Sequence, residues 1–371
     1  MIRLASVIET FEADFFAQYR HRITSDMRQA LHAMKRCRTA SSHFMQMECM
    51  QCEHQMLIPH SCGHRHCPHC QHHETQKWIA RQQSKLVPAR YFLLTYTLPA
   101  ELRALARAHP KQIYDSLMKC SWETLATFSQ NDQQLRGTPG AIAVLHTHTR
   151  QLEFHPHVHL VVPAAAINAE DKQWRCKRFK KGASYLFNHR ALAKVFRAKM
   201  LAAIQAAKLK LPAQYPQQWV VDCKAVGSGE KALVYLGRYL YRGVISEKNI
   251  ESCENGEVSF RYRDAKTQRN MTRTVPGAQF LWLVLQHVLP KGFRRSRNFG
   301  FLHPNRKQLI ALLQVLLKYA VTPIASIMPN RPTMCCPCCQ HPMAIRRTRI
   351  RAPCAQRQSV SSVAASQGVV R

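Results

Sequence analysis

One short segment, Phe154–Val162 (FHPHVHLVV), restricts the possible folds of this chain most. Its alternating residues predict a β-strand, in which positions two apart point to the same face. His157 and His159 would then lie side by side, with the intervening aliphatic residues turned into the core. Two imidazoles on one rigid strand form a ready bidentate metal site. The preceding strand-like run carries His146 and His148, and either could supply a third ligand across the hairpin.

The elements around this strand indicate the fold class. Between residues 89 and 290, strand-like and helix-like patterns alternate in the order β-α-β-β-α-β-α. The expected elements cover residues 91–98, 110–128, 141–149, 154–162, 192–204, 219–226 and 230–246. This order predicts an α+β fold, with an open, largely antiparallel sheet flanked by helices.

Two tyrosines, Tyr235 and Tyr239, are four residues apart in an expected helix and therefore share one face. Arg238 and Arg242 each follow a tyrosine by three positions, as phosphate-clamping side chains would. Tyrosines at this spacing are also common in ordinary helix packing. Beside a histidine-bound cation, however, a phenol can act as a nucleophile, because the cation stabilises the charge that develops on the phosphate. The product would be a phosphotyrosine ester, which keeps the bond energy for later joining without a nucleotide.

A block rich in cysteine and histidine lies near the N-terminus. Cys49-x2-Cys52 and Cys67-x2-Cys70 are separated by 14 residues, a spacing that predicts one four-sulfur zinc site. Further ligands that could complete a second site, or replace a cysteine in the first, are Cys37, Cys62 and His66. Near the C-terminus, residues 335–339 also contain CxxC pairs, but no second pair follows at knuckle spacing. The sequence leaves open whether this element binds metal.

The charge of the chain indicates a polyanionic partner. Its 54 Lys and Arg residues against 21 Asp and Glu residues give a formal net charge of +33 at pH 7. Such a field repels itself unless a polyanion screens it. Aromatic rings interleaved with cations, as in residues 172–181, suit unpaired bases and their backbone. The expected DNA-contacting residues are Arg238, Arg242, Lys172, Trp174, Arg175, Lys177, Arg178, Arg294, Arg295 and Arg297.

Composition divides the 371 residues into four regions. Residues 1–88 hold an N-terminal helix and a zinc-binding domain, and residues 89–290 form the sheet-containing domain. Residues 291–345 form a basic, helical region with the second CxxC element, and the tail at 346–371 is expected to be disordered. Acidic residues near the N-terminus argue against a secretory signal, and the apolar runs are too short to span a bilayer. We therefore expect a soluble, cytoplasmic, nucleoid-associated protein without a membrane partner, whose 15 cysteines favour metal ligation over disulfides.

Together these motifs resemble the HUH endonucleases, and among them the two-tyrosine rolling-circle transposases of the IS91 insertion-sequence family. The resemblance covers roughly residues 35 to 305 and includes SCGHRHCPHC, LHTHTRQLEFHPHVHLVVP, YLGRYLYR and LPKGFRRSRNFGFLHPN. It implies an HUH-type sheet preceded by a small zinc-binding domain, with Tyr235 and Tyr239 as nucleophiles. It also implies that His157, His159 and His146 bind Mg²⁺ or Mn²⁺, and that Zn²⁺ occupies the N-terminal domain. The implied reaction nicks and joins single-stranded DNA at insertion-sequence ends, leaving a 5′-phosphotyrosine and a free 3′-OH.

Three other functions are compatible with parts of this pattern. A replication initiator or relaxase would share the HUH core in another biological role. A histidine-triad nucleotide hydrolase would use the histidines at positions 155, 157 and 159 but leaves the tyrosine pair unexplained. A non-enzymatic zinc-finger protein would bind DNA without nicking it. One departure from the IS91 pattern is the GSGEK turn at residues 227–231, where that family has a proline-bearing glycine loop.

Overall fold

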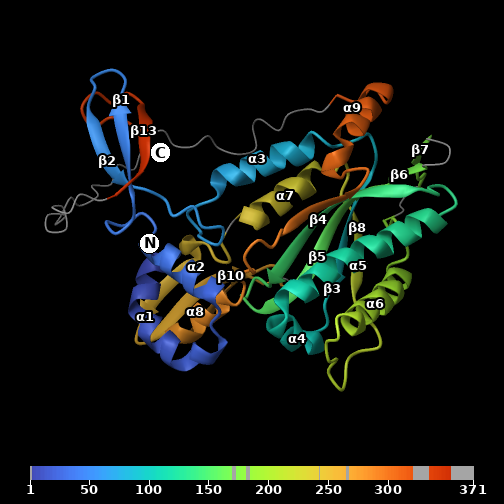
Figure 1. Ribbon diagram of the computed structural model, residues 1–371, viewed down its shortest axis with the longest axis horizontal. Coiled ribbons are helices and arrows are strands. Elements are labelled where there is room, and N and C mark those ends of the chain that lie inside the picture. Colours follow the sequence, from blue (N-terminus) through green and yellow to red (C-terminus); the bar gives the residue numbers. More distant parts are fainter. Residues whose placement is uncertain are drawn as a thin grey trace.

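Three β-sheets organise the part of the chain that the computed structural model describes, residues 2–168, 173–180, 184–241, 243–264, 267–320 and 334–351 (Figure 1). The largest has seven strands in the order β7-β6-β4-β5-β3-β8, with β12 also paired to β4. Its strands are β3 (Tyr91–Thr97), β4 (Thr138–His148), β5 (Phe154–Pro163), β6 (Ala165–Asn168), β7 (Gln173–Cys176), β8 (Val221–Ala225) and β12 (Ser296–Gly300). All of these pairings are antiparallel.

Helices cover both faces of this central sheet. One face packs against α4 (Arg103–Ala108), α5 (Pro110–Asn131) and α6 (His189–Ala206). Leu94, Leu145, Val158 and Leu160 point into this apolar layer. The opposite face packs against α3 (His72–Gln83), α7 (Glu230–Tyr241) and α9 (Lys307–Leu316). Because side chains alternate along a strand, residues 146, 157 and 159 face the α7 side of the sheet.

A second core joins the N-terminus to a later part of the chain. Helices α1 (Leu4–Tyr19) and α2 (Ser25–Arg36) pack on α8 (Gly277–Leu285). The adjoining sheet has the order β11-β10-β9 and consists of β9 (Ile250–Glu254), β10 (Glu257–Arg263) and β11 (Asn270–Pro276). Helices α1 and α8 lie so close together that a Cβ at position 277 would lie 2.3 Å from the Phe11 ring. Packing therefore links the expected regions 1–88 and 89–290.

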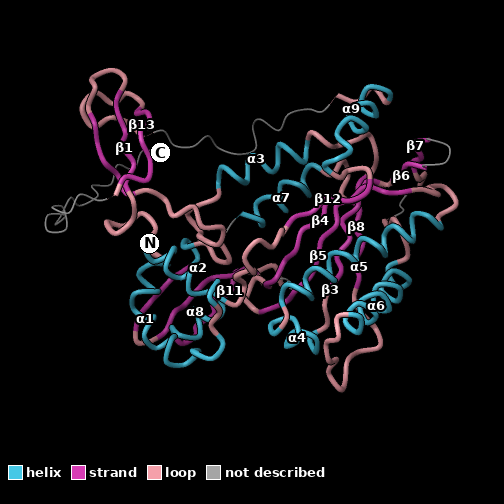
Figure 2. The backbone as a smooth tube through the Cα atoms, in the orientation of Figure 1, coloured by secondary structure: helices cyan, strands magenta, loops and turns pink. Residues whose placement is uncertain are grey.

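The third sheet pairs strands that lie about 300 residues apart in the sequence. Its order is β13-β1-β2, with β1 (Phe44–Cys49) between β2 (Gln55–Pro59) and β13 (Met343–Ile350). It projects from the rest of the molecule, at the upper left of Figures 1 and 2. The expectation that disorder begins at residue 346 is therefore wrong as far as Ile350, because this arginine-rich stretch pairs with a strand about 300 residues earlier. The tail from residue 352 lies outside the described residues.

The expected α+β class is confirmed, with an open antiparallel sheet flanked by helices. Each strand and helix predicted for residues 89–290 is present, but the helix expected to reach residue 246 ends at Tyr241. Strands β6, β7 and β12 of the central sheet were not expected from the sequence, and neither were β1, β2, β9 and β13. The described residues also include the short 3-10 turns η1 (Arg20–Arg22), η2 (Ala100–Leu102), η3 (Glu247–Asn249) and η4 (Pro304–Arg306). None of the described helices has both the length and the apolar composition needed to cross a bilayer.

The pairing of β12 with β4 yields a prediction for the stability of the protein. Gly300 has φ +60° and a Cβ there would lie 1.7 Å from the Pro139 carbonyl oxygen, whereas Gly292 has φ +75° and open space. Gly292→Ala should lower the free energy of unfolding by about 1–2 kcal/mol through backbone strain alone. Gly300→Ala should cost about 1–3 kcal/mol more, because β12 must move. Chemical denaturation of both variants checks this. Equal decreases in the free energy of unfolding would contradict the close contact between Gly300 and Pro139.

Candidate metal and tyrosine site

Three histidines converge on the α7 face of the central sheet. The β4–β5 register places His146 opposite His157 and Val144 opposite His159. The ring centroids of His146 lie 5.1 Å from His157 and 4.4 Å from His159, and the latter two are 4.9 Å apart. One ring nitrogen from each lies within 4.8 Å of the others. The structure thus brings together the three residues expected to hold the divalent ion.

Neighbouring groups orient these rings for metal binding. His157 Nδ1 lies 2.7 Å from the His155 carbonyl oxygen, and His159 Nδ1 lies 2.9 Å from Thr95 Oγ1. These contacts engage Nδ1 and leave the Nε2 atoms as ligands. His146 Nε2 is buried and has no hydrogen-bond partner in the structure. An unpaired buried nitrogen beside two oriented imidazoles fits a divalent cation.

The environment also keeps the three imidazoles neutral. Burial lowers the pKa of His157 to about 4 and that of His159 to about 3. Burial, together with the neighbouring histidines, lowers the pKa of His146 well below its usual value. A neutral imidazole is the form that binds metal. At neutral pH the cluster therefore needs no proton release before it binds a cation.

Helix α7 presents Tyr235 next to this cluster. The helix is anchored by an apolar face that includes the buried Leu233 and Leu236. The Tyr235 ring lies 6.3 Å from the His146 ring and 6.4 Å from the His159 ring, and the residue is 50% exposed. Burial raises its pKa, and Arg150 opposes that shift. Tyr235 is thus both close to the imidazoles and open to a ligand from solvent.

Tyr239 is held differently, although it lies one turn further along the same helix. Its ring stacks on His146 with centroids 3.3 Å apart. Its hydroxyl lies 2.9 Å from His148 Nδ1 and donates to the His148 carbonyl oxygen at 3.2 Å. Burial raises the pKa of Tyr239, and the nearby Arg295 guanidinium opposes the shift. The hydroxyl of Tyr239 is therefore engaged, and its ring forms one wall of the histidine cluster.

Arg295 has a structural role that the sequence did not reveal. Its guanidinium donates to the carbonyl oxygens of Leu145 at 3.0 Å and Leu240 at 3.2 Å. It also lies over the Tyr239 ring, 5.3 Å from the centroid. Arg295 thus fastens β4 to the end of α7. Thr95 was missed in the same way, because it acts through a partner distant in sequence. His148, considered from the sequence as a possible third ligand, instead contacts the Tyr239 hydroxyl.

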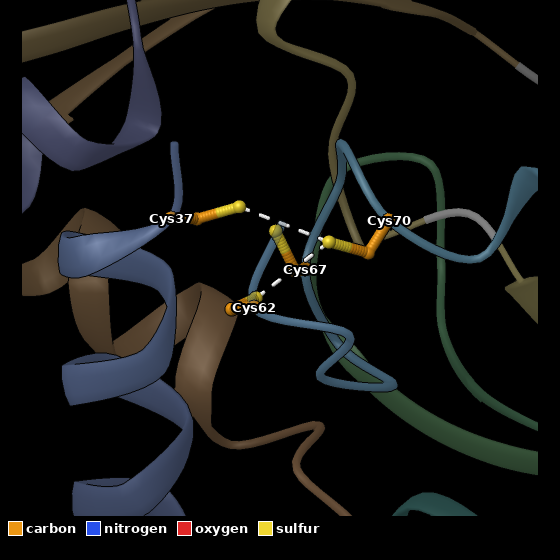
Figure 3. Close-up of side chains that lie close together, drawn as sticks. All are labelled: Cys37, Cys62, Cys67 and Cys70. Carbon is orange, nitrogen blue, oxygen red and sulfur yellow. Dashed lines mark hydrogen bonds between the residues drawn. The ribbon is translucent and has the colours of Figure 1, made fainter. Parts of the chain in front are cut away.

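The cysteines form two clusters, and two of the further ligands considered from the sequence, Cys37 and Cys62, belong to the first. Cys37, Cys62, Cys67 and Cys70 have ligand atoms within 4.8 Å of one another (Figure 3). The sulfur of Cys70 lies 3.7 Å from that of Cys37 and 3.6 Å from that of Cys62. The second cluster consists of Cys49, Cys52, Cys336 and Cys339. The predicted grouping of Cys49 and Cys52 with Cys67 and Cys70 is wrong for this structure, because strand β13 brings another CxxC pair to the first knuckle.

Known proteins resemble this chain over both the zinc and the histidine regions. Residues 7–98 match the family described as "Transposase zinc-binding domain", and residues 140–309 match the family described as "Putative transposase". The "Putative transposase y4qJ" of Sinorhizobium fredii is 31% identical over 343 residues, which is 86% of this chain and 85% of that protein. The chain belongs to the IS91-type transposase family.

One further relative and one solved structure were also found to be similar to this chain. The transposase for insertion sequence element IS801 of Pseudomonas savastanoi pv. phaseolicola is 31% identical over 266 residues, 68% of this chain and 63% of that protein. A solved conjugative relaxase TrwC in complex with oriT DNA is 13% identical and covers 62% of this chain and 73% of its own, with a TM-score of 0.25. Family membership favours a transposase over the nucleotide hydrolase and the non-enzymatic regulator considered from the sequence.

The zinc-binding domain of this transposase includes the first cysteine cluster. Four thiolates at this spacing fit a tetrahedral Zn²⁺ with no open position, which makes the site structural. His66 belongs to neither cluster, because its Nε2 accepts a hydrogen bond from the Leu289 backbone at 3.2 Å. The adjacent Arg65 donates to the Phe293 carbonyl oxygen at 3.1 Å. This loop therefore ties the zinc site to the segment that carries Arg295.

Seven Lys and Arg residues of the transposase line a groove of about 1190 Å³ between α3, β12 and α9. Arg294, Arg295 and Arg297, all expected DNA contacts, line it, and Arg297 pairs with Asp115. The groove cations that the sequence did not single out are Arg65, Arg81, Lys85 and Lys307. Burial and repulsion from Arg81 and Lys307 lower the pKa of Lys85. These like charges converge from α3, α9 and the loops beside α3, which favours an anion in the groove.

The other expected DNA contacts are scattered. Arg238 is exposed on α7. Trp174 packs on Phe301 with ring centroids 5.3 Å apart, and Lys177 pairs with Asp132. Arg175 on β7 and the nearby Arg178 lie at the far end of the sheet, about 25 Å from the histidines by strand length. Lys172 and Arg242 lie outside the described residues.

The hydrogen bond to His159 yields a prediction for metal affinity. Thr95→Val removes the oxygen that orients His159 and should weaken Mn²⁺ binding about 10- to 100-fold. Thr97→Val changes the same face of the same strand without touching that bond and serves as the control. Isothermal titration with Mn²⁺ measures both. Equal affinities in the two variants would show that Thr95 does not support the site.

Proposed function

We propose that this transposase nicks and rejoins single-stranded DNA at insertion-sequence ends, with Tyr235 as the nucleophile of the first cut. The observation that carries the proposal is the meeting of two buried imidazoles, one half-buried imidazole and one half-exposed phenol on one face of the sheet. The chemistry is transesterification, so the reaction needs no nucleotide. Its DNA substrate would place the protein at the nucleoid.

His146, His157 and His159 would hold Mg²⁺ or Mn²⁺ through their Nε2 atoms. When bound, such an ion polarises the scissile phosphate and stabilises the leaving oxygen. The Tyr235 oxygen attacks phosphorus and forms the 5′-phosphotyrosine bond while the bond to the 3′ oxygen breaks. The phenol proton is released and the 3′ oxygen leaves as a free hydroxyl after it gains a proton. Rejoining reverses these steps with a new 3′-OH.

Tyr239 would act second. Its hydroxyl is bonded to His148 and its ring is stacked on His146, so it is held out of reach of a phosphate beside Tyr235. Release from the His148 contacts would free the hydroxyl for a second attack. The pair would then allow one DNA end to stay attached while another is cut. Arg295, which lies over the Tyr239 ring, would keep the second tyrosine in place until then.

The order of the tyrosines can be tested by covalent trapping. Labelled single-stranded DNA carrying an insertion-sequence end is incubated with Mn²⁺ and analysed on denaturing gels. Tyr235→Phe should abolish the protein-linked fragment of the first cut, because no other described tyrosine is both near the imidazoles and exposed. Tyr239→Phe should retain that adduct and lose strand joining. Tyr185→Phe, an exposed tyrosine elsewhere, should match the wild type. A normal first adduct in Tyr235→Phe would refute the order.

We further propose that the groove lined by Arg81, Lys85 and Lys307 holds the backbone of the same DNA strand. Leu240, next to Tyr239, also lines the groove, so a strand lying there reaches the tyrosine helix. Arg81 lies in α3, Lys85 lies just after that helix and Lys307 begins α9, all on the same side of the sheet as the histidines. A DNA strand whose phosphates follow this side of the sheet would reach Tyr235.

The groove predicts a salt-dependent effect on affinity. Replacing Arg81, Lys85 and Lys307 together by Gln should weaken binding of single-stranded DNA and reduce the slope of log affinity against log salt by about 2. Lys111, Lys119 and Lys194 lie on α5 and α6, on the opposite face of the sheet, and their triple Gln variant is the control. Fluorescence anisotropy over a salt series measures both. Equal slopes in the two triple variants would exclude this path.

A further inference from the structure

Four cysteines from opposite ends of the chain meet in the projecting third sheet. Cys49 and Cys52 belong to the β1–β2 turn, and Cys336 and Cys339 belong to the turn before β13. Sulfur atoms lie 3.4 Å apart for Cys49 and Cys339, 3.5 Å for Cys52 and Cys336, and 3.4 Å for Cys52 and Cys339. All four are free thiols. The cluster is separate from the one shown in Figure 3.

The two turns have the same backbone design. The first cysteine of each turn donates its N–H to the carbonyl oxygen five residues later, at 2.9 Å to His54 and 2.8 Å to His341. Its own carbonyl accepts from the residue four later, at 3.0 Å from Glu53 and 2.9 Å from Gln340. Both of these residues have positive φ, 56° and 60°. Two segments far apart in sequence have thus adopted one CxxC turn.

Each turn also directs a backbone N–H at a sulfur atom. Gln51 N lies 3.5 Å from Cys49 Sγ, and Cys338 N lies 3.4 Å from Cys336 Sγ. Such N–H groups stabilise the thiolate form, which is the form that binds metal. The first cluster uses the same contact, since His64 N lies 3.4 Å from Cys62 Sγ. The backbone of both turns therefore favours the thiolate form that a metal ion needs.

The small sheet has little else to hold it together. Its buried core consists of Met47, Met343, Cys49 and Cys336, with a few half-buried side chains around them. A core of this size does not stabilise a module by itself, and small modules of this kind depend on a staple such as a structural metal. A metal ion bound by the cysteine cluster at its centre would stabilise this sheet.

We propose that Cys49, Cys52, Cys336 and Cys339 bind a second, structural Zn²⁺ that joins the two ends of the chain into one zinc ribbon. Four thiolates in two CxxC knuckles close the tetrahedral shell, so no position remains for a substrate. The ribbon lies partly outside the matched zinc-binding family region, which ends at residue 98. The inference is independent of the cleavage chemistry proposed above.

Metal content of the full chain tests the proposal. Elemental analysis of the wild type should find two zinc ions per chain, and the Cys336→Ser, Cys339→Ser double variant should retain one. The matched control is Cys335→Ser with Cys338→Ser, which changes the same loop outside the cluster and should retain two. Two zinc ions in the first double variant, one in the wild type, or iron in place of zinc would overturn the proposal.

A second measurement needs no substitution. Thiol alkylation of the native full chain, followed by mass spectrometry, should show Cys49, Cys52, Cys336 and Cys339 protected together while the exposed Cys338 reacts. A chelator should remove the protection of all four at once. Reaction of the exposed Cys52 as fast as Cys338 before chelation would contradict a metal at this site, even if the serine variants fail to fold.

Discussion

The pairing of β4 with β5 is the interaction on which the site depends. The register places His146 across from His157 and turns Leu145 and Val158 to the α5 side. A shift by one residue would carry the imidazoles to the opposite face of one strand and bury them against α5. The apolar alternation of both strands therefore keeps the three histidines on one face of the sheet. The same residues that form the core determine where the ligands point.

The zinc-binding domain contacts α7, the helix that carries Tyr235 and Tyr239. Helix α3 follows Cys70 closely and packs on α7, where a Cβ at Gly237 would lie 2.4 Å from Ile79. The glycine lets the two helices approach closely between the two tyrosines. On the other side, Arg295 holds the end of α7 against β4. The cluster of Cys37, Cys62, Cys67 and Cys70 thus helps determine where Tyr235 and Tyr239 lie.

Sequence reasoning succeeded where the determining pattern is local. The strand alternation around His157 and the four-residue spacing of Tyr235 and Tyr239 each depend on a few neighbouring residues. The fold class, the strands and helices of the central domain and the candidate site could therefore be predicted from them. It failed for the cysteine grouping, because Cys336 joins Cys49 only through a strand pairing across the whole chain. The same holds for Arg295, whose partners are the carbonyl groups of Leu145 and Leu240. Basic composition alone also did not separate lysines paired with acids, such as Lys177, from those in the groove.

The two cysteine clusters differ in when they can form during synthesis. Cys37, Cys62, Cys67 and Cys70 lie within one short stretch, so their site can close while most of the chain is still on the ribosome. The ribbon cannot close until Cys336 and Cys339 have emerged, because its two halves are about 290 residues apart. Closing so long a loop is slow and comes after local folding. A product that terminates early would retain the first cluster and expose an unpaired β1 edge, which is the kind of surface that promotes aggregation.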